Sequence, residues 1–265
     1  MTNFACRHVL VTGAASGVGR GIALDLARQG HRLLLTDLNE SGLKETVRLI
    51  DEQPKQASAA HATPRVYPLD ISSPEALDSF ASELSTQDID VIINNAGLQH
   101  VAPVDEFALK QWDLLMDVML RAPFVLMRSL LPGMRARKFG RIINIGSIHS
   151  LVASPFKSAY VAAKHGLLGL SKVAALETGD AEITVNTICP SYVRTPIVER
   201  QIQAQAQRHG ISEEDVINKI MLEPMPKRRF IGIDEIAATV AFLMSESARN
   251  ITGQTIVIDG GWTAR

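Results

Sequence analysis

Residues 8–29 read HVLVTGAASGVGRGIALDLARQ, and this stretch decides the fold. An apolar run at 8–12 indicates a buried strand, a glycine-rich turn follows, and an amphipathic pattern indicates a helix. Such glycines let the backbone approach a phosphate, and the helix N-terminus offers free N–H groups with a partial positive charge. Glycines also end ordinary strands, but their place between a strand and a helix favours a dinucleotide site. The predicted cofactor contacts in this turn are Gly13, Ser16, Gly17, Val18 and Gly19.

The same strand and helix alternation continues along the chain. The nearly continuous apolar character of the strands indicates a parallel sheet covered on both faces, and the order predicts a doubly wound α/β fold. We expect strands at His8–Thr12, Arg32–Thr36, Arg65–Leu69, Val91–Asn94, Arg141–Gly146, Thr184–Ile188 and Thr255–Ile258. We expect helices near 17–29, 40–53, 74–86, 106–137, 158–178 and 233–246.

Two stretches depart from this alternation. Residues 54–64, PKQASAAHATP, are small, polar and bounded by prolines, which indicates a surface loop. Residues 191–226 are helical in pattern and rich in Gln and Met, and they follow the sixth strand. Ligands of open α/β sheets bind beyond the carboxyl ends of the strands, so 191–226 could be a substrate lid. No composition shift marks a second domain, and we expect residues 1–265 to form one domain.

Composition excludes several classes of function. The chain has 265 residues, 46% hydrophobic and 21% charged, with a formal net charge of -1. This balance gives no sequence-independent attraction to nucleic acid or to an anionic membrane. Cys6 and Cys189 are the two cysteines, so neither a disulfide framework nor a metal site of the zinc type is expected. Residues 1–12 contain no signal-peptide core, and we expect a soluble cytoplasmic protein.

The ends of the second to fourth strands carry candidate cofactor residues. Asp37 lies eighteen residues past Gly19, where a carboxylate can accept both adenosine ribose hydroxyls and repel a 2′-phosphate. We therefore expect NAD rather than NADP, although Asp37 could instead cap the next helix. The later candidates are Asp70 and Ile71 at the adenine, and Asn95, Ala96 and Gly97 beside the cofactor. Simple strand-end chemistry is the alternative for all of them.

Three residues form a candidate acid/base centre. Tyr160 and Lys164 are four apart, so they share one face of a helix, and Ser147 lies thirteen residues before the tyrosine. A phenol has a reference pKa of about 10, and a nearby cation lowers it. Lowering it to about 7 takes roughly 4 kcal/mol, which one ammonium and a cationic cofactor ring could supply. A Tyr and a Lys at this spacing also occur by chance on surface helices.

All these motifs together resemble the short-chain dehydrogenase/reductase family along the whole chain. TGAASGVG, Asp37, NNAG, Ser147, the Tyr160/Lys164 pair, and Pro190 with Thr195 occur in its order. The resemblance implies a Rossmann-like seven-stranded sheet, usually a tetramer, and hydride transfer with a nicotinamide cofactor. It implies that Tyr160 is the acid/base, that Lys164 binds the ribose and lowers the tyrosine pKa, and that Ser147 holds the substrate oxygen. Further implied cofactor contacts are Tyr160, Lys164, Pro190, Val193 and Thr195.

Four longer segments resemble the bacterial members of this family that oxidise D-3-hydroxybutyrate to acetoacetate with NAD. They are NNAGLQHVAPVDEF, GRIINIGSIHSLVASPFKSAYVAAKHG, ICPSYVRTPIVERQI and the terminal DGGWTAR. This resemblance implies a carboxylate-binding cluster of Gln99, His149, Lys157 and Gln201 near Ser147 and Tyr160. Tyr192 replaces an expected Trp, and with Trp262 it would form an apolar wall beside a methyl group. Trp262 could equally be a core residue.

The sequence departs from the family pattern in the fourth long helix. The family usually carries a catalytic Asn there, and this chain has Met119, whose thioether cannot donate a hydrogen bond as an amide does. Pro123 follows four residues later and has no N–H, so the Met119 carbonyl loses its helical partner. Our hypothesis is that this carbonyl holds a water that reaches Lys164. The alternative is that Pro123 only kinks the helix.

Two other functions fit the same motifs. The chain could be a related dehydrogenase for a different hydroxy acid, a sugar or a sterol. It could also be a nucleotide-binding regulator without activity, which only Met119 suggests. Turnover of another alcohol would favour the first, and NAD binding without turnover would favour the second.

Overall fold

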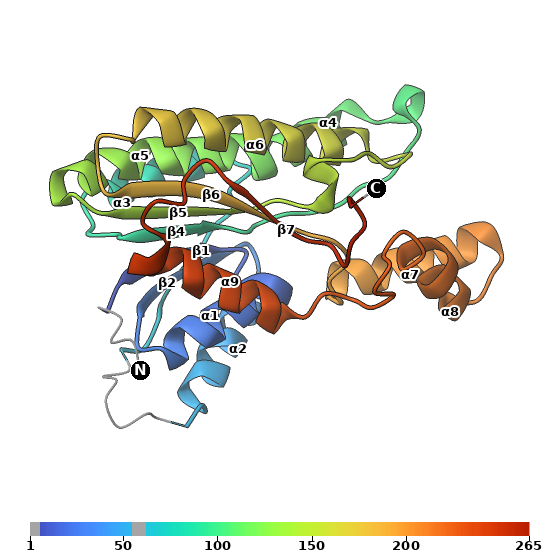
Figure 1. The fold of residues 1–265 in the computed structure, drawn as a ribbon, viewed down its shortest axis with the longest axis horizontal. Coiled ribbons are helices and arrows are strands. Elements are labelled where there is room, and N and C mark those ends of the chain that lie inside the picture. Colours follow the sequence, from blue (N-terminus) through green and yellow to red (C-terminus); the bar gives the residue numbers. More distant parts are fainter. Residues whose placement is uncertain (1–5, 55–61, 265) are drawn as a thin grey trace.

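The seven predicted strands form one parallel sheet. The computed structural model describes residues 6–54 and 62–264, and the sheet has the order β3-β2-β1-β4-β5-β6-β7 (Figure 1). All six strand pairs are parallel. The strands are β1 (His8–Thr12), β2 (Arg32–Asp37), β3 (Arg65–Pro68), β4 (Val91–Asn94), β5 (Gly140–Ile145), β6 (Ile183–Pro190) and β7 (Thr255–Ile258). The doubly wound fold is confirmed, with strand ends that differ from the prediction by one or two residues.

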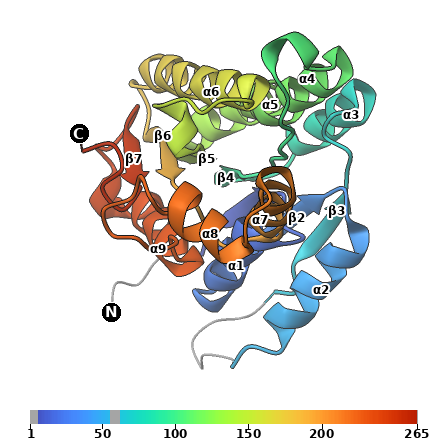
Figure 2. The same ribbon diagram turned by 90° about the vertical axis from the view of Figure 1, so that its right-hand side faces the viewer.

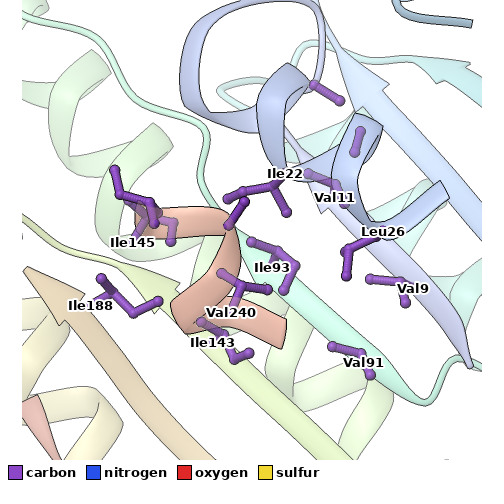
Figure 3. Close-up of a cluster of buried hydrophobic side chains, with 14 of the residues drawn as sticks. Val9, Val11, Ile22, Leu26, Val91, Ile93, Ile143, Ile145, Ile188 and Val240 are labelled. Carbon is purple, nitrogen blue, oxygen red and sulfur yellow. The ribbon is translucent and has the colours of Figure 1, made fainter. Parts of the chain in front are cut away.

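Helices cover both faces of this sheet. One layer holds α1 (Gly17–Arg28), α2 (Glu40–Asp51) and α9 (Ile233–Met244), and the other holds α3 (Pro74–Leu84), α5 (Ala122–Arg137) and α6 (Ser158–Glu177) (Figure 1). In the first layer, Ile22 and Leu26 of α1 and Val240 of α9 lie with strand residues in one buried cluster (Figure 3). Each is fully buried, which stabilises the fold by about 1.5–3 kcal/mol per side chain. Gly21 allows this close packing, since a Cβ there would lie 2.1 Å from Ile233 Cγ2.

The sheet order places a crevice between β1 and β4. β1 pairs with β2 on one side and with β4 on the other, so the connections leave β1 and β4 toward opposite layers. Ligands of this fold bind at such a reversal, beyond the carboxyl ends of the strands. The glycine-rich turn after β1 and the segment after β4 therefore meet at one place.

The helix predicted near 106–137 is confirmed over 109–137, but it contains a turn that the sequence pattern did not predict. A 3₁₀ turn at Val104–Glu106 precedes it, and the helical run consists of α4 (Leu109–Met116), a π-helical turn at Asp117–Arg121, and α5. In the π-helical turn the Ala122 N–H donates to the Asp117 carbonyl, five residues back. Pro123 has no N–H, so the normal four-residue ladder cannot continue through this point. The missing donor changes the hydrogen-bond pattern there, and the helical run continues.

The segment 191–226 is helical, as predicted. It contains α7 (Pro196–His209), α8 (Glu213–Val216) and a π-helical turn at Ile217–Met221. Figure 1 shows α7 and α8 beyond one end of the sheet, and Figure 2, which views that end, shows them in front of the strands. They pack through a small separate cluster that includes Val198, Ile202, Val216 and Met221.

Most of the predicted loop 54–64 lies outside the described residues, and residues 62–64 have no regular structure. Among the described residues, no helix combines the length and the apolar character needed to cross a bilayer.

Candidate active site

A crevice of about 340 Å³ opens at the carboxyl ends of the central strands, bordered by α7. It is lined by the glycine-rich turn, the ends of β5 and β6, one face of α6, and the start of α7. The predicted site residues that line it are Gly13, Ser16, Gly17, Val18, Asp37, Asn95, Gly97, Gln99, Ser147, His149, Lys157, Tyr160, Lys164, Pro190, Tyr192, Val193, Thr195 and Gln201. Five predicted residues do not line it, namely Gly19, Asp70, Ile71, Ala96 and Trp262.

The glycine-rich turn forms a cradle that larger residues would fill. Gly13 and Gly17 have φ of +67° and +54°, a left-handed conformation that glycine adopts without strain. A Cβ on Gly19 would lie 2.2 Å from the Gly13 carbonyl oxygen, so Gly19 supports the turn from behind. Ser16 is the N-cap of α1, and its side chain accepts no capping hydrogen bond. The turn and helix terminus therefore fit a pyrophosphate group.

The segment after β4 fixes this turn through hydrogen bonds. Thr12 Oγ1 accepts from the backbone N–H groups of Asn95 and Ala96, each at 3.0 Å. The Asn95 side-chain amide donates to the carbonyls of Thr12 (2.9 Å) and Gly13 (3.2 Å). Asn95 and Ala96 thus hold the loops after β1 and β4 together. An ordinary structural role at the end of a strand would account for the same hydrogen bonds.

Asp37 lies at the end of β2 and faces the crevice. One carboxylate oxygen accepts from the Ala15 N–H (3.0 Å), and the other accepts from the Asn39 N–H (2.9 Å). The N-cap of α2 is Asn39, whose side chain accepts from the Gly42 N–H. The alternative role of Asp37 as helix cap is therefore wrong, and its carboxylate is held in place at the crevice wall.

Asp70 and Ile71 follow β3 and lie outside the crevice. The Asp70 carboxylate accepts from the Ser72 N–H (2.9 Å) and the Ser72 hydroxyl (2.6 Å), which is local turn chemistry. Ile71 packs against two buried apolar clusters. The predicted adenine contact of these two residues stays a prediction.

Ser147, Tyr160 and Lys164 meet at the centre of the crevice. Ser147 is buried at the end of β5, and its hydroxyl accepts from the His149 N–H (3.1 Å). Lys164 is buried on α6, and its ammonium donates to the Ile145 carbonyl (2.7 Å) and lies 5.8 Å from the centre of the Tyr160 ring. Ser147 follows β5 and the other two residues lie on the next long helix, and the structure brings the three together as predicted.

Burial dominates the titration of this centre. It raises the pKa of Tyr160, and a hydrogen bond with Ser147 opposes that rise. Burial also lowers the pKa of Lys164 to about 8. The protein alone therefore does not produce the lowered tyrosine pKa that the Tyr-x-x-x-Lys spacing predicts. The reason is that the phenol is itself buried, while the Lys164 ammonium donates to the Ile145 carbonyl rather than to the phenol.

A second cluster lies beside this centre. The Lys157 ammonium donates to His149 Nε2 at 3.1 Å and lies 5.5 Å from the centre of the Tyr192 ring. Tyr192 stacks on Trp262 with 5.9 Å between ring centres. His149 meets the Tyr160 and Trp262 rings edge-on, with 6.2 and 6.0 Å between centres. Trp262 thus stands behind the crevice wall, and it packs against the core cluster between the sheet and α1.

The charge in this second cluster is uncompensated. Lys157 is 7% exposed, and no carboxylate of the described residues forms an ion pair with it. Burial lowers its pKa to about 8. Burial and then the Lys157 charge lower the pKa of His149 to about 4, so the imidazole is neutral and its Nε2 can accept. A buried cation without a partner is costly unless an anion binds beside it.

Two glutamines complete the rim of this cluster. Gln99 follows β4 and accepts from the His100 N–H through its Oε1 (3.2 Å), while Gln201 projects from α7 into the crevice lining. Both offer amide donors near Lys157, as an anion site requires.

Sequence reasoning missed several lining residues. They are Leu98, Ile145, Gly146, Ile148, Ser191, Pro196, Ile197, Val198 and Arg200. All of them lie within three positions of a predicted residue, and this proximity is the one signal in the sequence that could have identified them. Position 146 requires a glycine for a structural reason, since a Cβ there would lie 2.8 Å from Cys189 Sγ.

Met119 is buried beside the crevice. Its Sδ lies 3.6 Å from the position of a Cβ on Gly97, and it packs in one cluster with Ala159 and Ala163 of α6. The π-helical turn takes the Ala122 N–H away from the Val118 carbonyl, and Pro123 offers none to Met119. Both carbonyls therefore lack their ordinary helical donors.

Comparisons with known proteins agree with this geometry. A family model described as enoyl-(acyl carrier protein) reductase matches residues 13–263. The chain belongs to the short-chain dehydrogenase/reductase family. Within this family, the D-beta-hydroxybutyrate dehydrogenase of Rhizobium meliloti is 41% identical over 98% of this chain and 99% of its own. The enzyme of the same name from Cupriavidus necator is 39% identical over 98% of each chain.

A solved structure of the family confirms the fold. The protein from Beutenbergia cavernae, named as an NAD(P)-dependent gluconate 5-dehydrogenase with bound NADP at low occupancy, has a TM-score of 0.86. It is 31% identical, and the match covers 99% of this chain and 98% of that one. Short-chain dehydrogenase/reductase architecture, and the oxidoreductase class that goes with it, are thus shown.

Proposed function

We propose that this protein oxidises (R)-3-hydroxybutyrate to acetoacetate, reversibly, with NAD. The observation that carries the proposal is the buried Lys157 ammonium, which forms no ion pair with a carboxylate within residues 6–54 and 62–264 and lies in the same crevice as Ser147 and Tyr160. A small hydroxy acid supplies that carboxylate together with a hydroxyl for the acid/base centre. The two D-beta-hydroxybutyrate dehydrogenases similar to this chain support the same substrate.

The substrate is bound at its two ends. Its carboxylate accepts from Lys157, Gln99 and Gln201, while His149 Nε2 accepts from the Lys157 ammonium and orients it. Binding returns a counter-charge to the buried ammonium, which stabilises its protonated form. The methyl group lies against the Tyr192 ring, which Trp262 supports by stacking behind it. These contacts present the carbinol carbon to the acid/base centre.

Tyr160 is the base that removes the proton of the substrate hydroxyl. Ser147 holds the substrate oxygen, and the Tyr160 phenolate accepts the hydroxyl proton. When bound, NAD supplies the acceptor for the hydride that leaves C3. Burial of the phenol raises its pKa, so the positive charges of Lys164 and of the cofactor must offset that rise. The tightly held Lys164 keeps its charge close to the reaction while it donates to Ile145.

The crevice fits a dinucleotide with an unmodified ribose. Gly13, Gly17 and Gly19 form the cradle for the pyrophosphate, and Asp37 faces the place of the adenosine ribose. Its two oxygens already accept one backbone N–H each, and their remaining lone pairs can accept the two ribose hydroxyls. A 2′-phosphate would meet this carboxylate directly, which supports NAD over NADP.

We further propose one NAD-binding domain over residues 1–265 with 191–226 as its lid, assembled as a cytoplasmic homotetramer. Exposed apolar side chains on the outer helices support an assembly, with Leu176 of α6 84% exposed and Phe124 of α5 48% exposed. Free thiols at Cys6 and Cys189 support a reducing compartment.

The test is NAD reduction with (R)- and (S)-3-hydroxybutyrate measured in parallel. We expect rapid NADH formation with the R enantiomer, little with the S enantiomer, and a strong preference for NAD over NADP. Equal rates with both enantiomers, or faster turnover of an uncharged alcohol, would overturn the assignment. Binding of NAD without turnover of any alcohol would indicate a regulator on this scaffold.

A further inference from the structure

The far end of α7 contacts the loop that carries the anion-binding lysine. The Arg208 guanidinium lies over the Phe156 ring, 4.5 Å from its centre. Phe156 directly precedes Lys157, which is the N-cap residue of α6. The contact therefore joins the proposed lid to the residue next to the charge that binds substrate.

The sequence of α7 places Arg208 on the same helix face as two residues that line the crevice. Ile197, Gln201 and Arg208 are spaced by four and seven residues, so they lie along one face of the helix. The first two line the crevice, and the third reaches Phe156. At its other end α7 is capped by Thr195, whose Cγ2 lies 3.3 Å from the position of a Cβ on Gly17. A contact at each end thus sets how the face with Gln201 lies over the crevice.

The backbone of Phe156 supports a positional role. Its φ is +69°, a left-handed conformation that is rare for a bulky residue. Its carbonyl accepts from the Ala102 N–H at 3.0 Å, which ties it to the loop after β4. Because its ring is 43% exposed, burial in the core does not hold the residue there. Relaxation of this residue to an ordinary φ would redirect the peptide that leads into Lys157.

We propose that Arg208 and Phe156 form a latch that holds α7 over the crevice and keeps Lys157 and Gln201 facing one another. They are positioning residues, since neither lines the crevice. This inference rests on the proposed function for its substrate. An exposed cation–π contact of this kind favours the closed arrangement about two- to five-fold. The latch therefore acts on substrate affinity rather than on the chemical step.

A double-mutant cycle tests the latch. Arg208→Ala and Phe156→Leu should each raise KM for (R)-3-hydroxybutyrate about two- to five-fold, with kcat and KM for NAD unchanged. The double variant should be no worse than the worse single variant, and Phe156→Tyr, which keeps the ring, should retain the native KM. Gln207→Ala, an exposed neighbour on α7, is the matched control. The latch would be refuted if the fold-increases in KM of the two single variants multiplied in the double variant. It would also be refuted if KM rose in Arg208→Ala but not in Phe156→Leu.

Hydrogen exchange separates this inference from the function on which it rests. With NAD bound and no substrate added, amides of 197–208 should exchange about two- to five-fold faster in Arg208→Ala and Phe156→Leu than in the native protein or Gln207→Ala. Unchanged exchange in both variants would overturn the latch whatever the substrate is. Faster exchange in a protein that does not oxidise (R)-3-hydroxybutyrate would support the latch while refuting the proposed substrate.

Discussion

Lys157→Met is the substitution that tests the anion site most directly. It removes the buried charge and keeps an unbranched side chain of similar length, so the pocket is not emptied. The lost interaction is a hydrogen bond from a charged group to the substrate carboxylate, worth about 1.5–3 kcal/mol. We therefore expect KM for (R)-3-hydroxybutyrate to rise roughly 10- to 150-fold, at about 1.36 kcal/mol per tenfold change. KM for NAD should not change.

The same substitution should stabilise the folded protein. Burial lowers the Lys157 pKa from 10.5 to about 8, a difference equivalent to about 3 kcal/mol at about 1.36 kcal/mol per unit. Below pH 8 both the folded and the unfolded chain carry the proton, so the folded state bears this whole cost. Between pH 8 and 10.5 only the unfolded chain keeps it, and the cost disappears as pH rises.

At pH 7, Lys157→Met removes that cost and also the hydrogen bond to His149, worth about 1 kcal/mol. The net gain is roughly 2 kcal/mol, or about 4–8 °C in Tm for a chain of this size. Calorimetry of the protein without substrate measures it. The expected signature is therefore a more stable enzyme with weaker substrate binding.

Two controls make this prediction specific. Lys172→Met makes the same change at an exposed position of α6 and should alter neither KM nor Tm appreciably. (R)-Butan-2-ol replaces the carboxylate by a methyl group, so its kcat/KM should be nearly the same in the native and Lys157→Met enzymes. An unchanged KM for hydroxybutyrate, or an equal loss with butanol, would refute the role of Lys157 as the carboxylate anchor.

Three further predictions follow from the same crevice. Tyr160→Phe should lower kcat about 10²- to 10⁴-fold while NADH fluorescence titration shows native binding, and a loss of binding would point to a structural role. Asp37→Ala should reduce the ratio of kcat/KM for NAD to that for NADP by about tenfold or more, whereas a native enzyme that already prefers NADP would contradict the argument. Pro123→Ala returns an N–H to the Met119 carbonyl and should lower turnover and shift its pH profile if that carbonyl serves Lys164. An unchanged turnover rate and pH profile in Pro123→Ala would show that the proline only kinks the helix.

Much of the fold follows from local patterns in the sequence. Apolar runs separated by amphipathic segments specify parallel strands and crossover helices, because each pattern needs only its own neighbours to be recognised. The helix predicted near 106–137 is present, but its π-helical turn was not predicted, because the apolar period continues through Asp117–Arg121 while Pro123 removes one donor. Whether the chain bends or forms a π-helical turn there depends on what packs against it.

The sequence also predicted most residues of the candidate site, while the tertiary structure decided their physical state. The glycine turn, Asp37, Ser147, Tyr160 and Lys164 are recognisable by type and spacing, because the chemistry tolerates few alternatives at each place. Their environment is not readable in this way, since burial depends on segments that are distant in the chain. Only the folded structure ties Asp37 to two backbone amides and buries the ammonium of Lys157 away from the carboxylates of the part of the chain that the structure describes. Contacts between distant segments also place Arg208 over Phe156, because a helix pattern fixes which face a residue occupies but not what that face meets.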